Sequence, residues 1–135
     1  MKHILFSFLL IILSLTLVNC SDGPINKITF QNIAGGAVKV SFRGQTIDVP
    51  SGQVAELKDI DKGEFEYETV YEIPLGASSN SAEGEMSGTF VLKAGTKILV
   101  IYSSVLSEEG AYTIYASVTT SDDLTEGEDP NPLGP

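Results

Sequence analysis

The feature that most restricts the fold of this chain is an alternation of apolar and polar residues, with a period of two, from residue 25 to residue 120. Residues 37–43, for example, place Val38, Val40 and Phe42 on one side of an extended chain and polar residues on the other. Turn signals rich in Gly, Pro and Asp separate such runs, and no stretch beyond residue 20 carries a sustained helical stripe. Because successive side chains of a strand point to opposite faces, this pattern predicts an all-β protein.

The spacing of these runs predicts a single antiparallel β-sandwich of about seven or eight strands at residues 25–120. We expect the strands at residues 25–32, 37–43, 46–49, 53–57, 64–73, 85–92, 97–105 and 111–119. The Ser- and Asn-rich residues 74–82 are expected to form a loop. Residues 98–102 are apolar on both faces, which is typical of a central strand that is covered from both sides.

The N-terminal residues 1–19 have the character of an export signal. Met1-Lys2-His3 is a short basic start, and residues 4–18 form an apolar run that only hydroxyl side chains interrupt. The run is shorter than the roughly 20 residues that span a bilayer, but it fits the apolar core of a signal peptide, which has roughly 7–15 residues. It stops at Cys20, the only cysteine of the chain.

The tetrapeptide Leu17-Val18-Asn19-Cys20 resembles the lipobox of bacterial lipoproteins. The resemblance implies that Cys20 receives diacylglycerol on its thiol, that the signal peptide 1–19 is removed, and that the new amino group is acylated. Residues 20–24 then form the acylated Cys and a short linker. Several acyl chains give stable attachment to a membrane. The alternatives are an ordinary secretory signal with an incidental Cys20 and an uncleaved anchor helix.

A second resemblance covers most of residues 28–102. The strings ITFQNIAGGAVKVSF, VPSGQVAELKDIDKGEFEYET and GTFVLKAGTKILVIY are similar to small immunoglobulin-like or transthyretin-like sandwiches of bacterial lipoproteins. This resemblance supports the predicted fold. It implies no particular chemistry, because many such families have no known activity.

Composition excludes several classes of function. The chain has 18 Asp and Glu against 8 Lys and Arg, a net charge of −10, so nucleic acid is not expected as a partner. The only histidine is His3, inside the predicted signal peptide. The mature chain therefore lacks a histidine base, a Cys–His pair, a Ser–His–Asp triad, a zinc site of the usual ligands and an internal disulfide. We expect no cofactor and no metal.

One predicted strand carries a row of four carboxylates on a single face: Glu64, Glu66, Glu68 and Glu72. Neighbours in such a row lie roughly 6.5–7 Å apart, near the separation of roughly 6.5–9.5 Å in inverting glycosidases. A catalytic pair requires one buried acid, whereas this row is expected on a solvated face opposite Lys39 and Arg43. The sequence therefore predicts no catalytic residue. The alternatives for this face are a cation site and a patch for a basic partner.

Two further groups of residues invite a functional interpretation. Residues 59–64 carry acids at alternate positions beside Gly63, as calcium loops do, but Lys62 breaks the ligand pattern. A β-turn is favoured, in which Asp side chains accept backbone N–H bonds and Gly63 takes a positive φ. Six aromatic residues could form a sugar-binding surface: Phe65, Tyr67, Tyr71, Tyr102, Tyr112 and Tyr115. Because the chain has no Trp, we expect these rings to pack in the core instead.

Residues 121–135 are expected to form a disordered acidic tail. They hold five acids, three Pro, two Gly and no base, so they bury too little apolar surface to offset the entropy of ordering. An acidic docking tail for a basic partner is the alternative.

Together these features predict a lipoprotein of the bacterial cell envelope that is not an enzyme. It would be held by lipid on Cys20 and would bind or support a protein, glycan or other envelope component. In enterobacterial lipoproteins an Asp directly after the Cys favours the inner membrane. Ser21 resembles the outer-membrane case instead, so the resemblance implies the outer membrane. The alternative is a carboxylate-dependent hydrolase of the glycoside type that uses acids of residues 64–72.

Overall fold

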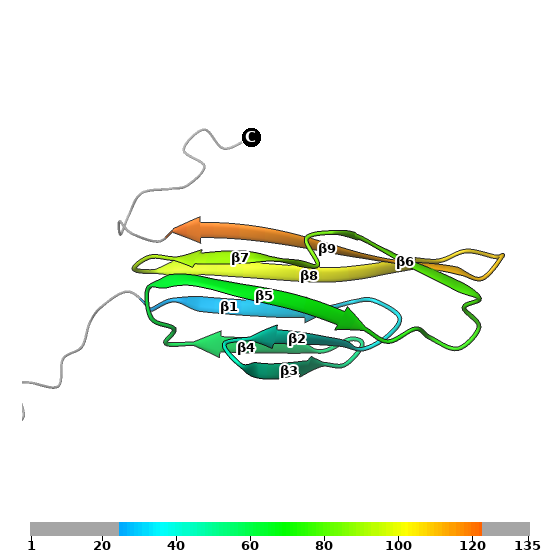
Figure 1. The fold of residues 1–135 in the computed structure, drawn as a ribbon, viewed down its shortest axis with the longest axis horizontal. Coiled ribbons are helices and arrows are strands. Elements are labelled where there is room, and N and C mark those ends of the chain that lie inside the picture. Colours follow the sequence, from blue (N-terminus) through cyan, green and yellow to red (C-terminus); the bar gives the residue numbers. More distant parts are fainter. Residues whose placement is uncertain (1–24, 123–135) are drawn as a thin grey trace, which may run out of the picture.

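The computed structural model describes residues 25–122 and consists of two β-sheets packed face to face (Figure 1). The described residues form nine strands: β1 (Lys27–Asn32), β2 (Val38–Phe42), β3 (Gln45–Val49), β4 (Val54–Lys58), β5 (Gly63–Tyr71), β6 (Ser79–Gly84), β7 (Ser87–Leu92), β8 (Thr96–Leu106) and β9 (Ala111–Asp122). The predicted all-β sandwich is confirmed. The signal peptide, Cys20 and the acidic tail from residue 123 onward lie outside the described residues.

The strand order shows how the chain crosses between the layers. One sheet has the order β4-β1-β8-β9-β6 and the other has the order β3-β2-β5-β7. Most neighbours are antiparallel, as predicted, but β1 pairs parallel with β8, and β6 pairs parallel with β9. Because the chain repeatedly passes from one sheet to the other, many neighbours in a sheet come from distant parts of the sequence.

The core lies between the sheets and is filled by the inward residues of the alternating runs. Ile28 and Phe30 of β1 are fully buried, as are Val38 and Val40 of β2. The rings of Tyr67 and Phe90 stack in parallel, with their centroids 4.0 Å apart. The period-two pattern therefore identified the inward face of these strands correctly.

Strand β8 is central in its sheet, as predicted, but only one of its faces is buried. Ile98, Val100 and Tyr102 point into the core. Leu99 and Ile101, on the outer face, are partly exposed, and no further layer of described residues covers them. The expectation of cover on both sides was wrong because the molecule has only two layers over residues 25–122.

Strand β6 was missed, since residues 74–82 were expected to be a loop. All six of its residues are exposed, and it pairs only with residues 111–116 of β9. An edge strand that buries no side chain shows no apolar alternation.

Strand β9 ends later than predicted. Its Ser121 and Asp122 pair with Lys97 and Thr96 of β8, so the sheet extends two residues beyond the predicted boundary at Thr120. The predicted tail therefore begins inside a strand.

A buried asparagine closes the end of β1. Asn32 is fully buried, and its side chain binds three backbone groups at 2.9 Å each: the Ala34 N–H and the carbonyls of Gly36 and Val49. These bonds join the β1–β2 turn to β3, which compensates the cost of burying an amide.

Candidate functional site

The row of acids on β5 is exposed, as the alternation predicts. Glu64, Glu66 and Glu68 lie on the outer face of the four-stranded sheet, and Glu72 follows the end of β5. In the register, Glu68 lies between Ser41 of β2 and Ser87 of β7. The row therefore runs down the middle of an open sheet face.

The basic residues expected opposite this row do not pair with it. Lys39 lies on β2, the neighbour of β5, but its register partners are Val70 and Asp48. The Arg43 guanidinium lies over the ring of Phe65, 5.4 Å from the centroid. No ion pair within residues 25–122 joins either base to the row, so the expected charge pairing is wrong. Arg43 occupies the β2–β3 turn, with φ of 52°, and its guanidinium packs on the Phe65 ring instead of pairing with a carboxylate.

An open depression of about 500 Å³ lies over this face, which we call the acidic hollow. It is lined by residues 41–44, 66–68 and 87–89. Glu66 and Glu68 reach it from β5, with hydroxyl groups of Ser41 and Ser87 beside them. Both carboxylates are exposed, so burial does not distinguish one from the other as an acid–base pair requires.

The loop at residues 59–62 connects β4 to β5, as the turn interpretation predicts. Asp59 adopts a left-handed conformation with φ of 57°, and Gly63 has φ of 146°. The buried Asn26 links this loop to the start of β8. Its Nδ2 donates to the Ile60 carbonyl at 2.9 Å, and its Oδ1 accepts the Thr96 N–H at 2.8 Å. The carboxylates of the loop make no hydrogen bond within residues 25–122, contrary to our expectation of Asp side chains binding the backbone.

No three metal-ligating side chains gather to form a cation site in the part of the chain that the structure describes. The acids of the row and of the 59–64 loop are spread along a sheet face and a turn. They do not converge on a single point, as the oxygen ligands of calcium must.

The aromatic residues pack mainly in the core, as expected. Tyr67, Tyr102 and Tyr112 are buried, and Phe65 and Tyr71 pack against the core from its margin. A sixth ring, that of Tyr115, is 38% exposed and lies on the outer face of the other sheet. The six rings therefore form no common platform for a sugar.

A second hollow, of about 270 Å³, lies between the edges of the two sheets, and no sequence pattern indicated it. It lies where the chain passes from β6 to β7, against β9. Here the Tyr67 hydroxyl donates to the Glu85 carbonyl at 2.8 Å, and a Glu85 carboxylate oxygen accepts the Val118 N–H at 2.8 Å. Burial, followed by the charge of Glu85, raises the pKa of Tyr67. The carboxylate of Glu85 thus satisfies a backbone N–H of β9, which is a structural role.

No protein-family model and no curated protein matches this chain. A structure solved by NMR, of a protein from Eubacterium rectale, covers 82% of this chain and 97% of its own length, with 14% identity and a TM-score of 0.33.

Among the described residues, no helix is long and apolar enough to cross a membrane. The acidic face also carries the exposed side chains of Val70 and Val91, and the outer face of the five-stranded sheet carries three lysines and the exposed side chains of Val54 and Val105.

Proposed function

We propose that this chain is a lipid-anchored lipoprotein of the bacterial cell envelope whose sandwich is a non-enzymatic binding or structural module. The lipobox-like sequence ending at Cys20 supports the anchor. Strand β1 begins at Lys27, so only a short linker separates the sandwich from the proposed lipid. Such a protein acts at a membrane surface, with an envelope protein or glycan as its partner.

The observation that carries the non-enzymatic part is the exposure of every acid in the row on β5. General acid catalysis at neutral pH requires a carboxylic acid that burial or a charged neighbour keeps protonated. The buried polar side chains Asn26, Asn32 and Thr69 are instead engaged in hydrogen bonds within the fold.

The test of the anchor is the covalent state of Cys20 after expression in a bacterium. The wild-type chain should incorporate labelled palmitate, and its intact mass should correspond to an acylated chain that begins at Cys20. The Cys20→Ser variant should take up no label and should keep residues 1–19. Ser21→Ala is the matched control, because it changes the adjacent residue and leaves the thiol. A wild-type chain with an unmodified Cys20 contradicts the proposal.

The second candidate is a carboxylate-dependent glycoside hydrolase, favoured by the presence of Glu66 and Glu68 in one hollow. It predicts that the purified chain cleaves a glycan and that Glu66→Gln or Glu68→Gln lowers the rate by at least about a hundredfold. Glu64→Gln is the control, since Glu64 lies outside the hollow. Equal rates in all these variants exclude the hydrolase.

A further inference from the structure

Four turns build the end of the sandwich that lies farthest from the start of β1, and we call this the distal end. They are residues 33–37, 50–53, 72–78 and 107–110. Figure 1 shows that β1 begins and β9 stops at the opposite end of the molecule. The distal end is therefore the part of the sandwich most remote from the residues that lead to Cys20.

Exposed aliphatic side chains gather on and beside the turns of the distal end. Leu75 is 101% exposed, so its whole side chain protrudes into solvent. Near the opposite end, the described residues expose two such side chains, those of Ile25 and Val91. The distal end exposes six: Ile33, Val54, Ile73, Leu75, Val105 and Leu106. A concentration of apolar side chains at one place on the surface marks an interaction site, whereas scattered ones do not.

Hydrogen bonds hold the turns of the distal end in fixed positions. The Gly35 N–H donates to the Ser104 hydroxyl at 2.8 Å, which joins the first turn to β8. The Ser78 N–H donates to the Gly110 carbonyl at 2.8 Å, which joins the third turn to the fourth. A Cβ placed on Gly35 would lie 4.0 Å from the Pro74 ring, so the first and third turns are also in contact. Because the surface is already formed, a partner can bind it without ordering a loop.

Acidic residues border the aliphatic side chains of the distal end. Its four turns contain no Lys and no Arg, and they contain three acids: Glu72, Glu108 and Glu109. Such an arrangement is complementary to an apolar surface with a basic border, because potentials of opposite sign face each other across an interface.

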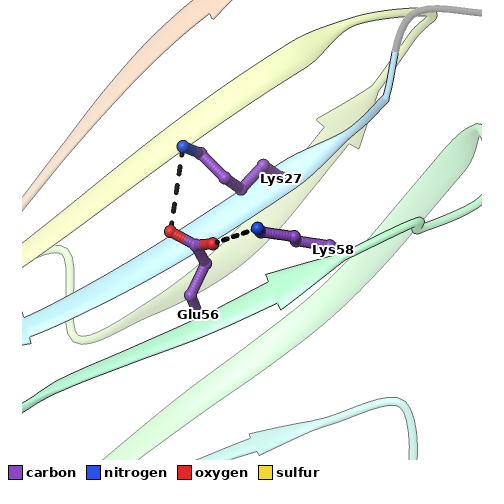
Figure 2. A network of polar contacts seen from close by, with 3 residues as sticks. All are labelled: Lys27, Glu56 and Lys58. Carbon is purple, nitrogen blue, oxygen red and sulfur yellow. Dashed lines mark ion pairs between the residues drawn. The ribbon is translucent and has the colours of Figure 1, made fainter.

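The lysines lie instead at the end where β1 begins. The register places Lys27 of β1 between Lys58 of β4 and Lys97 of β8. Glu56 forms ion pairs with Lys27 at 3.8 Å and with Lys58 at 3.2 Å (Figure 2). The distal turns therefore lack the bases by which proteins approach anionic lipid.

We propose that the distal end docks on an envelope protein and inserts Leu75 and its aliphatic neighbours into an apolar recess bordered by Lys or Arg. This inference deepens the proposed function and rests on it for the orientation of the molecule. The seven steps from Cys20 to Lys27 span at most about 25 Å, so a lipid on Cys20 would keep the start of β1 near the membrane. Strand β8 would then carry the distal end roughly 35 Å farther out.

The shape and charge of the distal end favour a protein recess over other occupants. The protruding Leu75 is buried only if its partner supplies a hollow. Anionic lipid would be repelled by Glu108 and Glu109, and it would meet no base in the distal turns. A second copy joined through the same end would place these acids against each other.

The test is site-specific photo-cross-linking of the full chain in the bacterium that produces it. The photoreactive residue p-benzoyl-L-phenylalanine replaces Leu75, and in the control it replaces Val91, which is exposed near the opposite end. Docking predicts that the probe at Leu75 gives a product of one discrete mass that the probe at Val91 does not give. Mass spectrometry of the linked peptides should place the contact in an apolar recess of the partner that has Lys or Arg at its border.

Substitutions beside the probe distinguish a specific interface from chance capture. In the chain with the probe at Leu75, Leu106→Ser should lower the yield of the product about tenfold, as loss of a central apolar contact does. Val91→Ser is the matched control, because Leu106 and Val91 are both 47% exposed, and it should leave the yield unchanged. Glu108→Lys should lower the yield because it faces the basic border, whereas Glu64→Lys should not. Unchanged melting temperatures of the purified variants show that folding is not the cause.

Several outcomes would overturn this inference. One is the absence of a product specific to the probe at Leu75, and another is a yield that neither Leu106→Ser nor Glu108→Lys lowers. A product made of two copies of this chain, a link to residues 123–135 or a link to lipid would each assign the distal end to that occupant instead. A mass without lipid on Cys20, together with an intact product at Leu75, refutes the anchor and leaves the docking.

Discussion

At the scale of single residues, three buried hydroxyl groups show how the two layers meet. Tyr102 is fully buried, and its hydroxyl shares a hydrogen bond of 2.7 Å with the Thr69 hydroxyl across the core. Tyr112 is almost as completely buried, yet its hydroxyl has no hydrogen-bond partner among the described residues. The buried tyrosine hydroxyl therefore stabilises the fold at position 102, where it is hydrogen-bonded, and destabilises it at position 112, where it is not.

Substituting these two tyrosines should give opposite results. Tyr102→Phe leaves the Thr69 hydroxyl buried without its partner and should lower the free energy of unfolding by about 1–3 kcal/mol. Tyr112→Phe removes an unsatisfied hydroxyl and should leave that free energy unchanged or raise it by up to about 1 kcal/mol. Equilibrium unfolding in urea measures both. A clear loss of stability in Tyr112→Phe would show that its hydroxyl has a partner, such as a buried water.

The titration of Tyr102 should make the fold sensitive to alkaline pH. Burial raises the pKa of Tyr102 to about 12, from 10.0 for the ordinary side chain. Between these values the unfolded chain releases the proton while the folded chain keeps it, so stability falls as pH rises from about 10 to about 12. The loss should be about 2–3 kcal/mol.

Unfolding midpoints measured over this pH range test the effect. Tyr102→Phe should reduce the dependence but not abolish it, because the pKa of Tyr67 is also raised. An identical alkaline loss in Tyr102→Phe would assign the effect to another group.

At the scale of elements, the junction between β6 and β7 is a tight crossing between the two sheets. Gly84 ends β6 with φ of 85°, and a Cβ at this position would collide with the carbonyl oxygen of Ala116. The next residue, Glu85, donates its N–H to that carbonyl at 2.9 Å. Only glycine allows β6 to remain beside β9 and the chain then to turn into the other sheet.

Gly84→Ala should be far more destabilising than the same change at Gly76. Gly76 also has a positive φ, of 95°, but a Cβ there would meet no atom within 4 Å. Gly76→Ala should therefore cost about 1 kcal/mol from backbone strain alone, whereas Gly84→Ala adds the backbone collision and should cost at least about 3 kcal/mol. Thermal unfolding of the two variants compares them directly. Equal losses would mean that β6 is not held by this junction.

At the scale of the whole molecule, charge is divided between the layers. The acidic residues concentrate on the outer face of the four-stranded sheet, and lysines gather at the end of the other sheet where β1 begins. A two-layer sandwich keeps these outer faces apart, so they can meet different partners.

Truncation at the C-terminus should locate the end of the cooperative unit. Removal of residues 123–135 should leave the melting temperature nearly unchanged, because that segment has only two large apolar residues, both Leu. Removal of 121–135 also deletes Ser121 and Asp122 from the β8–β9 pairing and should lower it. Scanning calorimetry distinguishes the two cases. A large fall after the shorter deletion would show that the segment packs on the sandwich.

The sequence by itself determined the fold class and the inward face of most strands. Alternation in β1, β2 and β5 is local, and burying the apolar side of each run is favourable whatever its neighbours are. The exposure of the acid row on β5 follows from the same rule. The absence of histidine from residues 25–122 is likewise a property of the sequence alone.

Only the tertiary structure decided which strands pair and what the polar residues contact. The parallel pairings of β1 with β8 and β6 with β9 join segments far apart in the chain, and β6 buries nothing that a pattern could reveal. Lys39 lies opposite Val70 instead of a glutamate because of strand register. The outer apolar residues of β8 lack a covering layer because residues 25–122 build only two layers. Local alternation specifies a face, whereas register and partners depend on contacts between distant segments.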